Sequence, residues 1–134
     1  MTEHSSGLDT FGTCVRSIME IEGKGLGFHE CNVQGEPSAI CLTYGGERLA
    51  LEFSRGAPEY ETQFALSSPV TCRRYSFADL MQYDEIKSWV MTNRLVLRDE
   101  ERTDAEIRWV LSFVKWLLTS SVSGSKLFPG VATP

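Results

Sequence analysis

The chain has 134 residues, of which 42% are hydrophobic and 23% are charged, so it is long enough for one globular domain with a single core. Its net charge of −5 argues against general binding to nucleic-acid phosphates. No apolar run approaches the roughly 20 residues of a membrane-spanning helix, and the polar N-terminus is unlike a secretion signal. We therefore expect a cytoplasmic protein with neither nucleic acid nor membrane as a partner.

The N-terminal segment predicts an amphipathic helix. Ser6 and Asp9 have the spacing of a capping residue and its reciprocal partner, and apolar residues then recur at mostly three- and four-residue steps. Three glycines between positions 23 and 27 predict that the helix ends there. The apolar stripe consists of Leu8, Phe11, Val15, Ile18 and Met19.

The middle of the chain predicts an antiparallel meander of three or four strands. Gly45 and Gly46 predict a tight two-residue link between the second and third strands. Apolar and polar residues alternate in the third and fourth strands, so one face of the sheet is apolar and the other is polar. The expected strands cover 28–34, 39–44, 48–54 and 59–66.

The last part of the chain predicts helices. Ser76 and Asp79 have capping spacing and open a short helix, which continues or restarts toward position 90. Thr103 and the acid three residues later form a second capping box, in front of the clearest apolar stripe in the sequence. That long helix is expected to end near Ser120, where small hydroxyl residues replace the apolar pattern.

These elements together predict an α+β fold. An N-terminal helix precedes the antiparallel three- to four-stranded meander, and C-terminal helices pack on one face of the sheet. Residues 1–122 are expected to form a single globular domain. Residues 123–134 contain glycine, serine and proline and are expected to form a loose tail.

A second stripe on the last long helix carries three aromatic residues, Trp109, Phe113 and Trp116. A helix that is apolar on two sides is either buried on both sides or covers a dimer contact. Both interpretations stay open at this point, so the chain is expected to be a monomer or a homodimer.

The sequence does not assemble a metal site or a complete catalytic set. The cysteines are too far apart for a zinc knuckle or a redox dithiol, so we expect reduced thiols, no metal and no cofactor. A small hydrolase is the least favoured interpretation, and it would use Cys31 with His29, or the paired acids Glu59 and Glu61. The four cysteines are Cys14, Cys31, Cys41 and Cys72.

Acidic residues are concentrated in the first half of the chain. Residues 1–64 contain ten acidic and four basic residues, a net charge of −6, whereas residues 65–134 have a net charge of +1. A continuous acidic face attracts a basic partner and speeds its encounter. The alternative is a solvated surface that only aids solubility.

Several short segments and the order of the elements add a resemblance. The segments are Gly27-Phe28, YGGERL at 44–49, LEFSRG at 51–56, EYE at 59–61 and YSFADL at 75–80. Over roughly residues 8–118, the chain resembles the small α+β immunity proteins that bacteria encode beside polymorphic or contact-dependent toxins. The resemblance implies a cytosolic, non-catalytic protein that binds one toxin domain and blocks its active site. Such toxins are often basic nucleases, which an acidic inhibitor surface suits.

The first hypothesis is therefore an acidic immunity-type inhibitor that contacts a basic toxin domain through the exposed face of the sheet and its turns. The alternatives are a structural or adaptor subunit that dimerises through its last helix and, third, the small hydrolase. The expected contact residues are Glu47, Glu52, Arg55, Glu59, Tyr60 and Glu61.

Overall fold

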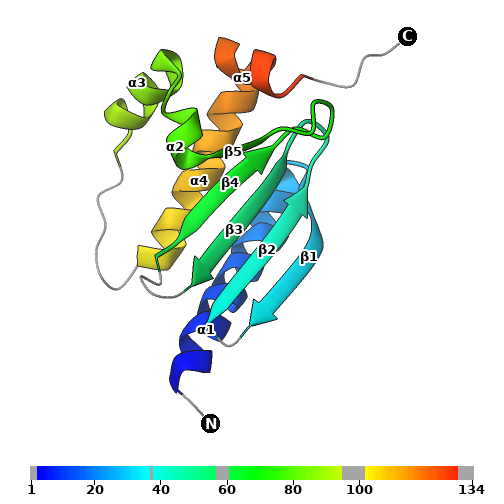
Figure 1. The fold of residues 1–134 in the computed structure, drawn as a ribbon, viewed down its shortest axis with the longest axis vertical. Helices are drawn as coiled ribbons and strands as arrows, with labels where there is room; N and C mark the ends of the chain where they lie inside the picture. Colours follow the sequence, from blue (N-terminus) through cyan, green and yellow to red (C-terminus); the bar gives the residue numbers. More distant parts are fainter. Residues whose placement is uncertain (1–2, 37, 57–60, 95–101, 130–134) are drawn as a thin grey trace.

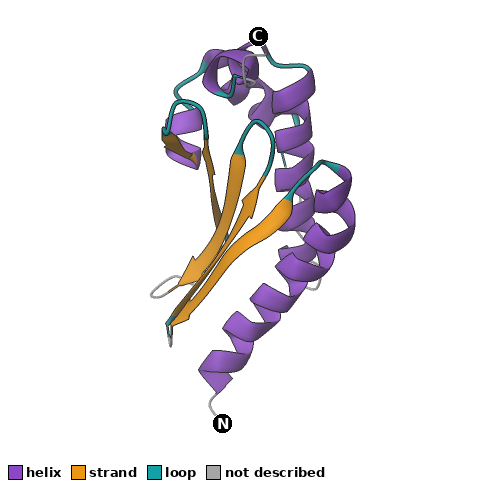
Figure 2. Ribbon diagram, turned by 90° about the vertical axis from the view of Figure 1, so that its right-hand side faces the viewer, coloured by secondary structure: helices purple, strands orange, loops and turns teal. Residues whose placement is uncertain are grey.

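The computed structural model describes residues 3–36, 38–56, 61–94 and 102–129. Five antiparallel strands form one layer, and two long helices cover one face of that sheet (Figure 1, Figure 2). The fold is therefore α+β, as the sequence predicts. The strands are β1 (His29–Glu36), β2 (Ala39–Gly45), β3 (Ala50–Gly56), β4 (Gln63–Ser67) and β5 (Arg74–Ser76).

The helices stand at the two ends of the chain, before and after the sheet. None of those in the described part combines the length and apolar character that crossing a membrane requires. They are α1 (Glu3–Ile18), its π-helical continuation η1 (Met19–Gly23), α2 (Phe77–Leu80), α3 (Asp84–Thr92), α4 (Arg102–Thr119) and α5 (Val122–Leu127).

The strand order is β1-β2-β3-β4-β5, so every strand pairs with its neighbour in the sequence. Leu42 pairs with Phe53, which in turn pairs with Phe64, and this register lines up apolar side chains on the face that the helices cover. A β-bulge shifts the register of β1 between Glu30 and Asn32. The sequence did not predict β5, because three residues are too few to show an alternating pattern.

The core lies between the sheet and the pair α1 and α4, which pack side by side on the same face (Figure 2). Four members of the predicted N-terminal stripe are buried, namely Phe11, Val15, Ile18 and Met19, and the side chain of the fifth, Leu8, lies outside the described residues. From α4, Phe113 reaches Phe64 of β4, with 5.9 Å between ring centroids. The N-terminal helix therefore shares the covering of the sheet with the C-terminal helices.

Two predicted helix starts are wrong and one is confirmed. Helix α1 already begins at Glu3, so Ser6 lies inside it, and Thr103 likewise lies inside α4. Ser76 does cap α2: the backbone N–H of Asp79 donates to its hydroxyl at 3.2 Å, and the N–H of Ser76 donates to the Asp79 carboxylate at 2.9 Å. That capping box forms because both of its partners belong to the same turn.

The link between β2 and β3 is a four-residue loop and not the predicted two-residue turn. Gly45 still pairs with Ala50, which leaves residues 46–49 in the loop. Leu49 is buried there, and a Cβ on Gly46 would lie 2.8 Å from both the Leu49 carbonyl oxygen and the Phe28 ring. The loop is longer because Leu49 turns into the core and needs this close approach.

The segment predicted as a loose tail is instead ordered through most of its length. Residues 122–127 form α5, and both Leu127 and Phe128 are buried, the latter with 0% exposure. Phe128 packs against Tyr75 with 5.5 Å between ring centroids. Burial of these apolar side chains, which sequence periodicity could not show, extends the domain beyond residue 122. Residues 130–134 of the predicted tail lie outside the described residues.

Candidate functional site

The acidic residues of the predicted contact do not form one patch. Glu52, on the face of β3 away from the helices, accepts a hydrogen bond from Arg74 of β5 at 2.6 Å. Glu47 is exposed in the loop at one end of the sheet, and Glu61 is exposed before β4 at the other end. A strand rises about 3.3 Å per residue, so β3 places these ends roughly 20 Å apart. Two further predicted contact residues, Glu59 and Tyr60, lie outside the described residues.

Arg55 was expected to contact the partner from the turn after the third strand, but it belongs to β3 and its side chain faces the helices. It stands two positions after a core phenylalanine, so strand alternation turns it toward the helices. Its guanidinium lies 4.4 Å from the Phe11 ring centroid and donates to the hydroxyls of Thr62 and Thr103 at 2.6 and 3.2 Å. It also lies 3.9 Å from the carboxylate of Glu106. With a side chain only 18% exposed, Arg55 ties the sheet to α1 and α4.

The aromatic stripe of α4 packs against other elements of the same chain. Trp89 of α3 stacks on Trp116 with 5.1 Å between ring centroids and contacts Phe113 at 5.5 Å. Phe113 is 0% exposed, so its assignment to a dimer contact is wrong: α3 and the sheet cover it from both sides. Trp109 and Trp116 are half-buried, and both contact the same Trp89 ring.

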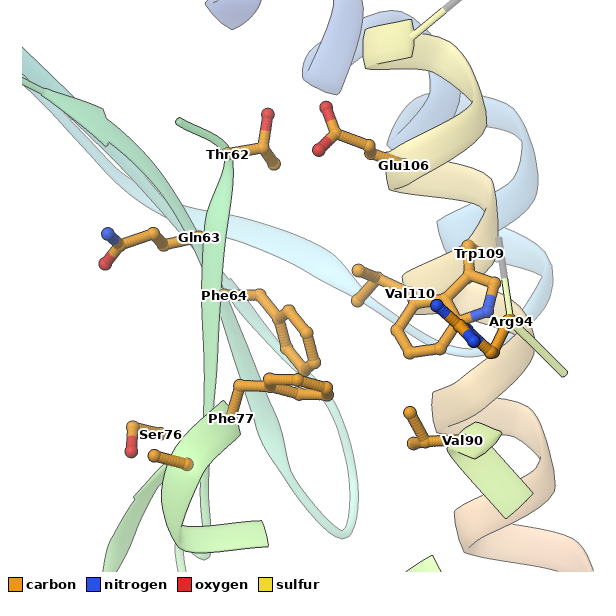
Figure 3. Close-up of a pocket in the computed structure, with 11 residues that line it drawn as sticks. Thr62, Gln63, Phe64, Ser76, Phe77, Val90, Arg94, Glu106, Trp109 and Val110 are labelled. Atoms are coloured by element: carbon orange, nitrogen blue, oxygen red, sulfur yellow. The ribbon is translucent and has the colours of Figure 1, made fainter. Parts of the chain in front are cut away.

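Beside this cluster, a cavity of about 520 Å³ opens between β4 and α2 on one side and α3 and α4 on the other (Figure 3). We call it the aromatic groove. Its apolar lining consists of Phe64, Phe77, Ala78, Val90, Trp109 and Val110. Thr62, Gln63, Ser76, Arg94 and Glu106 supply its polar groups.

The walls of the aromatic groove are held by ring contacts and one hydrogen bond. Phe64 and Phe77 meet with 5.6 Å between centroids on one wall. On the other wall, Trp109 stacks on Phe113 at 5.7 Å with 7° between the ring planes. The indole N–H of Trp109 donates to the carbonyl oxygen of Asn93 at 2.7 Å, which fixes the ring against the end of α3.

The charges of the aromatic groove lie at separate places. Glu106 faces Thr62 at one end, where the Arg55 guanidinium compensates its charge (Figure 3). Arg94 follows α3 and is exposed, and its side chain lies on the same wall as Trp109 (Figure 3). None of the described residues forms an ion pair with Arg94.

Strand β1 is an exposed edge of the sheet (Figure 1). Every residue in it except Val33 is exposed, and among the described strands it pairs with β2 alone. Glu30 receives two hydrogen bonds from Arg16 of α1, at 2.8 and 3.0 Å, and these hold the pKa of Glu30 below its usual range. Burial raises the pKa of the neighbouring Tyr44 hydroxyl to about 12. Glu36, at the end of β1, is exposed.

The candidate nucleophile Cys31 and the candidate base His29 both lie beside Gly45 of the neighbouring strand β2. A Cβ on Gly45 would lie 2.9 Å from the sulfur of Cys31 and 3.2 Å from Nε2 of His29, so both side chains lie beside Gly45, in space that a side chain there would fill. Both side chains are exposed, and the thiol donates to the His29 carbonyl oxygen at 3.8 Å. A catalytic pair needs a third group to orient the imidazole, and no described residue hydrogen-bonds to it.

The described residues also include no cluster of three or more histidine, cysteine, aspartate or glutamate side chains that could hold a metal ion.

The sequence indicated only some of the residues that line the aromatic groove. Phe77 follows the capping Ser76, and Trp109 belongs to the second stripe of α4, but nothing indicated that α2, α3, α4 and β4 meet there. Arg94 carried no signal at all.

We compared the chain with protein-family models, curated proteins and solved structures, and none of them matches it. Its function must therefore be inferred from the surfaces of this chain.

Proposed function

We propose that this chain is a non-catalytic acidic binding protein of the immunity type, which neutralises a cognate bacterial toxin in the cytoplasm by covering its active site. The layout-level resemblance and the net charge of −6 in residues 1–64 support this proposal. The structural observation that carries it is the exposed edge strand β1 together with the uncovered outer face of the sheet.

Edge strands present a row of backbone N–H and C=O groups that pair readily with another chain. Proteins usually protect such edges with charged side chains, proline, a β-bulge or a very short strand. The bulge in β1 lies between Glu30 and Asn32, but from Asn32 to Glu36 the strand pairs regularly with β2, and this part contains no lysine, arginine or proline. An edge of this kind suits an extended segment of a protein partner, for which main-chain hydrogen bonds supply affinity.

The charges beside this edge favour a basic partner. Glu36 ends β1, and Glu61 precedes β4 at the same end of the sheet. Both are exposed, so they raise the local concentration of a positively charged surface without a large desolvation cost. We therefore place the partner contact on β1 and this acidic end of the sheet, with Glu52 and Glu47 farther along the same layer.

The test begins with the gene next to this one, which the proposal requires to encode a protein with a toxin-like C-terminal domain. Co-expression should restore growth of cells that make the toxin domain, and the purified proteins should associate quickly at low salt. The double variant Glu36→Lys/Glu61→Lys should associate about tenfold more slowly, with a flatter salt dependence, because steering acts mainly on the association rate. Asp84→Lys, on α3, is the control for the single variants Glu36→Lys and Glu61→Lys, because each of the three changes the charge by +2, and it should associate at the wild-type rate.

Two results would contradict different parts of the proposal. If the Glu36→Lys/Glu61→Lys variant associated at the wild-type rate, the proposed contact surface would be wrong, but the proposed function would not be contradicted. If the unmodified chain neither bound nor neutralised the neighbouring toxin domain, the proposed function itself would be wrong.

A further inference from the structure

We infer that the aromatic groove is a binding site for a small apolar carboxylate, whose hydrocarbon part lies against Phe64, Phe77 and Trp109 and whose carboxylate pairs with Arg94. The inference goes beyond the proposed function, because the groove lies at the β4 side of the sheet and uses none of the residues of β1.

The size and lining of the aromatic groove are those of a ligand site. Its volume of about 520 Å³ lies within the roughly 300–1,000 Å³ typical of small-molecule pockets. Such pockets are mostly apolar and contain a few polar groups that fix the orientation of the ligand. Phe77 is 38% exposed although it is large and apolar, so a ligand would remove additional apolar surface from water.

The walls are in place before any ligand binds. Trp109 is fixed from behind by Phe113 and at its edge by the hydrogen bond to the Asn93 carbonyl oxygen. The side-chain amide of Asn93 in turn donates to the carbonyl oxygen of Trp89 at 2.9 Å. Both bonds are made by Asn93, the residue that precedes Arg94. The aromatic walls therefore lose little conformational entropy when the groove is occupied, and the exposed Arg94 side chain is the part that a ligand has to order.

The charge of the ligand follows from the two ionisable residues that line the groove. Glu106 already has Arg55 beside it, so it has little remaining preference for a cation. Arg94 is exposed, and no described residue pairs with it, so its guanidinium is available to an anion. A planar guanidinium matches the two oxygens of a carboxylate, and the apolar walls require that the rest of the ligand be hydrocarbon.

Tryptophan fluorescence provides a direct test, because all three tryptophans of the chain lie in the aromatic cluster. The full chain is titrated at neutral pH with decanoate and with the neutral decanol, both below their aggregation limits. We expect a saturable change with decanoate and about tenfold weaker binding of decanol, the ratio typical of one hydrogen-bonded charge.

Variants then assign the selectivity to the groove. Arg94→Gln should bind the two compounds equally, at the affinity of the wild-type chain for decanol. Lys87→Gln, which removes an exposed charge of α3 outside the groove, should retain the tenfold preference. Ala78→Phe fills the groove from an exposed position and should weaken the binding of both compounds.

Equal affinity for decanoate and decanol in the wild-type chain would overturn the inference. So would an unchanged preference in Arg94→Gln, or the absence of any saturable change. Because Arg94 and Ala78 are both exposed, their variants should unfold at the wild-type urea midpoint, and this measurement separates a lost site from a lost fold.

Discussion

The carboxylate of Glu85 in α3 accepts a hydrogen bond from the hydroxyl of Ser121, the residue that precedes α5, at 2.8 Å. The same carboxylate accepts bonds from the backbone N–H groups of Val122 and Ser123 at 3.2 and 2.7 Å. These hydrogen bonds lower the pKa of Glu85 to about 2, and the bond from the Ser123 backbone N–H has the largest effect. A side chain of one helix thus satisfies the free N–H groups at the start of another.

This contact makes the stability of the chain depend on pH. The pKa of Glu85 in the folded chain lies below its ordinary value of 4.5, so the ionised carboxylate stabilises the fold above that pH. The contribution is lost as the pH falls from about 4.5 toward 2. Glu85→Gln should therefore have a lower urea midpoint than the wild type at pH 7, and the two midpoints should converge near pH 2.

The control for this pH series is Glu36→Gln, which removes an exposed carboxylate from the edge strand. Its midpoint should follow that of the wild type at pH 7. A Glu85→Gln midpoint equal to that of the wild type at neutral pH would show that the carboxylate does not hold α5.

Gly124 of α5 allows the closest approach between α5 and α4. A Cβ at this position would lie 1.8 Å from the Leu117 carbonyl oxygen, so Gly124→Ala forces the two helices apart. We expect the free energy of unfolding to fall by about 2–4 kcal/mol, as measured by urea denaturation. Gly35→Ala is the matched control: nothing lies within 4 Å of its Cβ, and it should change stability by less than about 0.5 kcal/mol.

Arg48 joins the end of α4 to the residue after α5. Its guanidinium donates to the carbonyl oxygens of Leu118 and Phe128 at 2.8 and 3.0 Å. Arg48→Leu leaves both acceptors without this donor and should lower the free energy of unfolding by about 1–3 kcal/mol. Trypsin should also cleave after Lys126 sooner than in the wild type. Equal cleavage rates in Arg48→Leu and Lys87→Leu would contradict this role.

Arg55 is expected to act in stability and not in partner binding. Arg55→Met leaves the half-buried Glu106 without its guanidinium and should cost about 2–4 kcal/mol in urea denaturation. The double variant Arg55→Met/Glu106→Gln should recover part of that loss, because the uncompensated charge is gone. A stability cost that simply adds in the double variant would show that the two side chains are not coupled.

Trp116 tests whether the aromatic stripe of α4 serves the fold or an interface. Because Trp116 stacks on Trp89, Trp116→Ala should lower the free energy of unfolding by about 2–4 kcal/mol. Sedimentation should give the same mass for this variant and for the wild type. A wild-type dimer that becomes a monomer in Trp116→Ala would instead place the side chain at an interface.

The sequence pattern predicted those features of the fold that depend on contacts between residues close together in the chain. Ser76 and Asp79 cap α2 as expected, and the alternation in residues 50–56 identifies the core face of β3. The same alternation, continued to Arg55, places it on that face, but the sequence predicted that the strand ends at residue 54 and that Arg55 lies in the following turn. Partners from other elements satisfy the charge of Arg55, and a single strand cannot show them.

Elements fixed by distant contacts were not predictable. The six residues of α5 include glycine and two serines and show no apolar period, and the helix forms where Glu85 and Leu117 meet it. The aromatic groove requires four elements that are separated along the chain. The pairing of Glu52 with Arg74 depends on the strand order and on β5, which the sequence pattern did not show.

The seam between α1 and α4 has a consequence for how the chain is made. Cys14 donates to Asp104, and Arg108 donates to Glu22 at 2.8 Å, across 90 and 86 residues of sequence. The strands, in contrast, pair only with their sequence neighbours. During translation the hairpins can form as they leave the ribosome, whereas α1 and the apolar side of the sheet lack α4 until it too has emerged. Between the emergence of β4 and that of α4, the part of the apolar sheet face that α4 covers is therefore exposed to water.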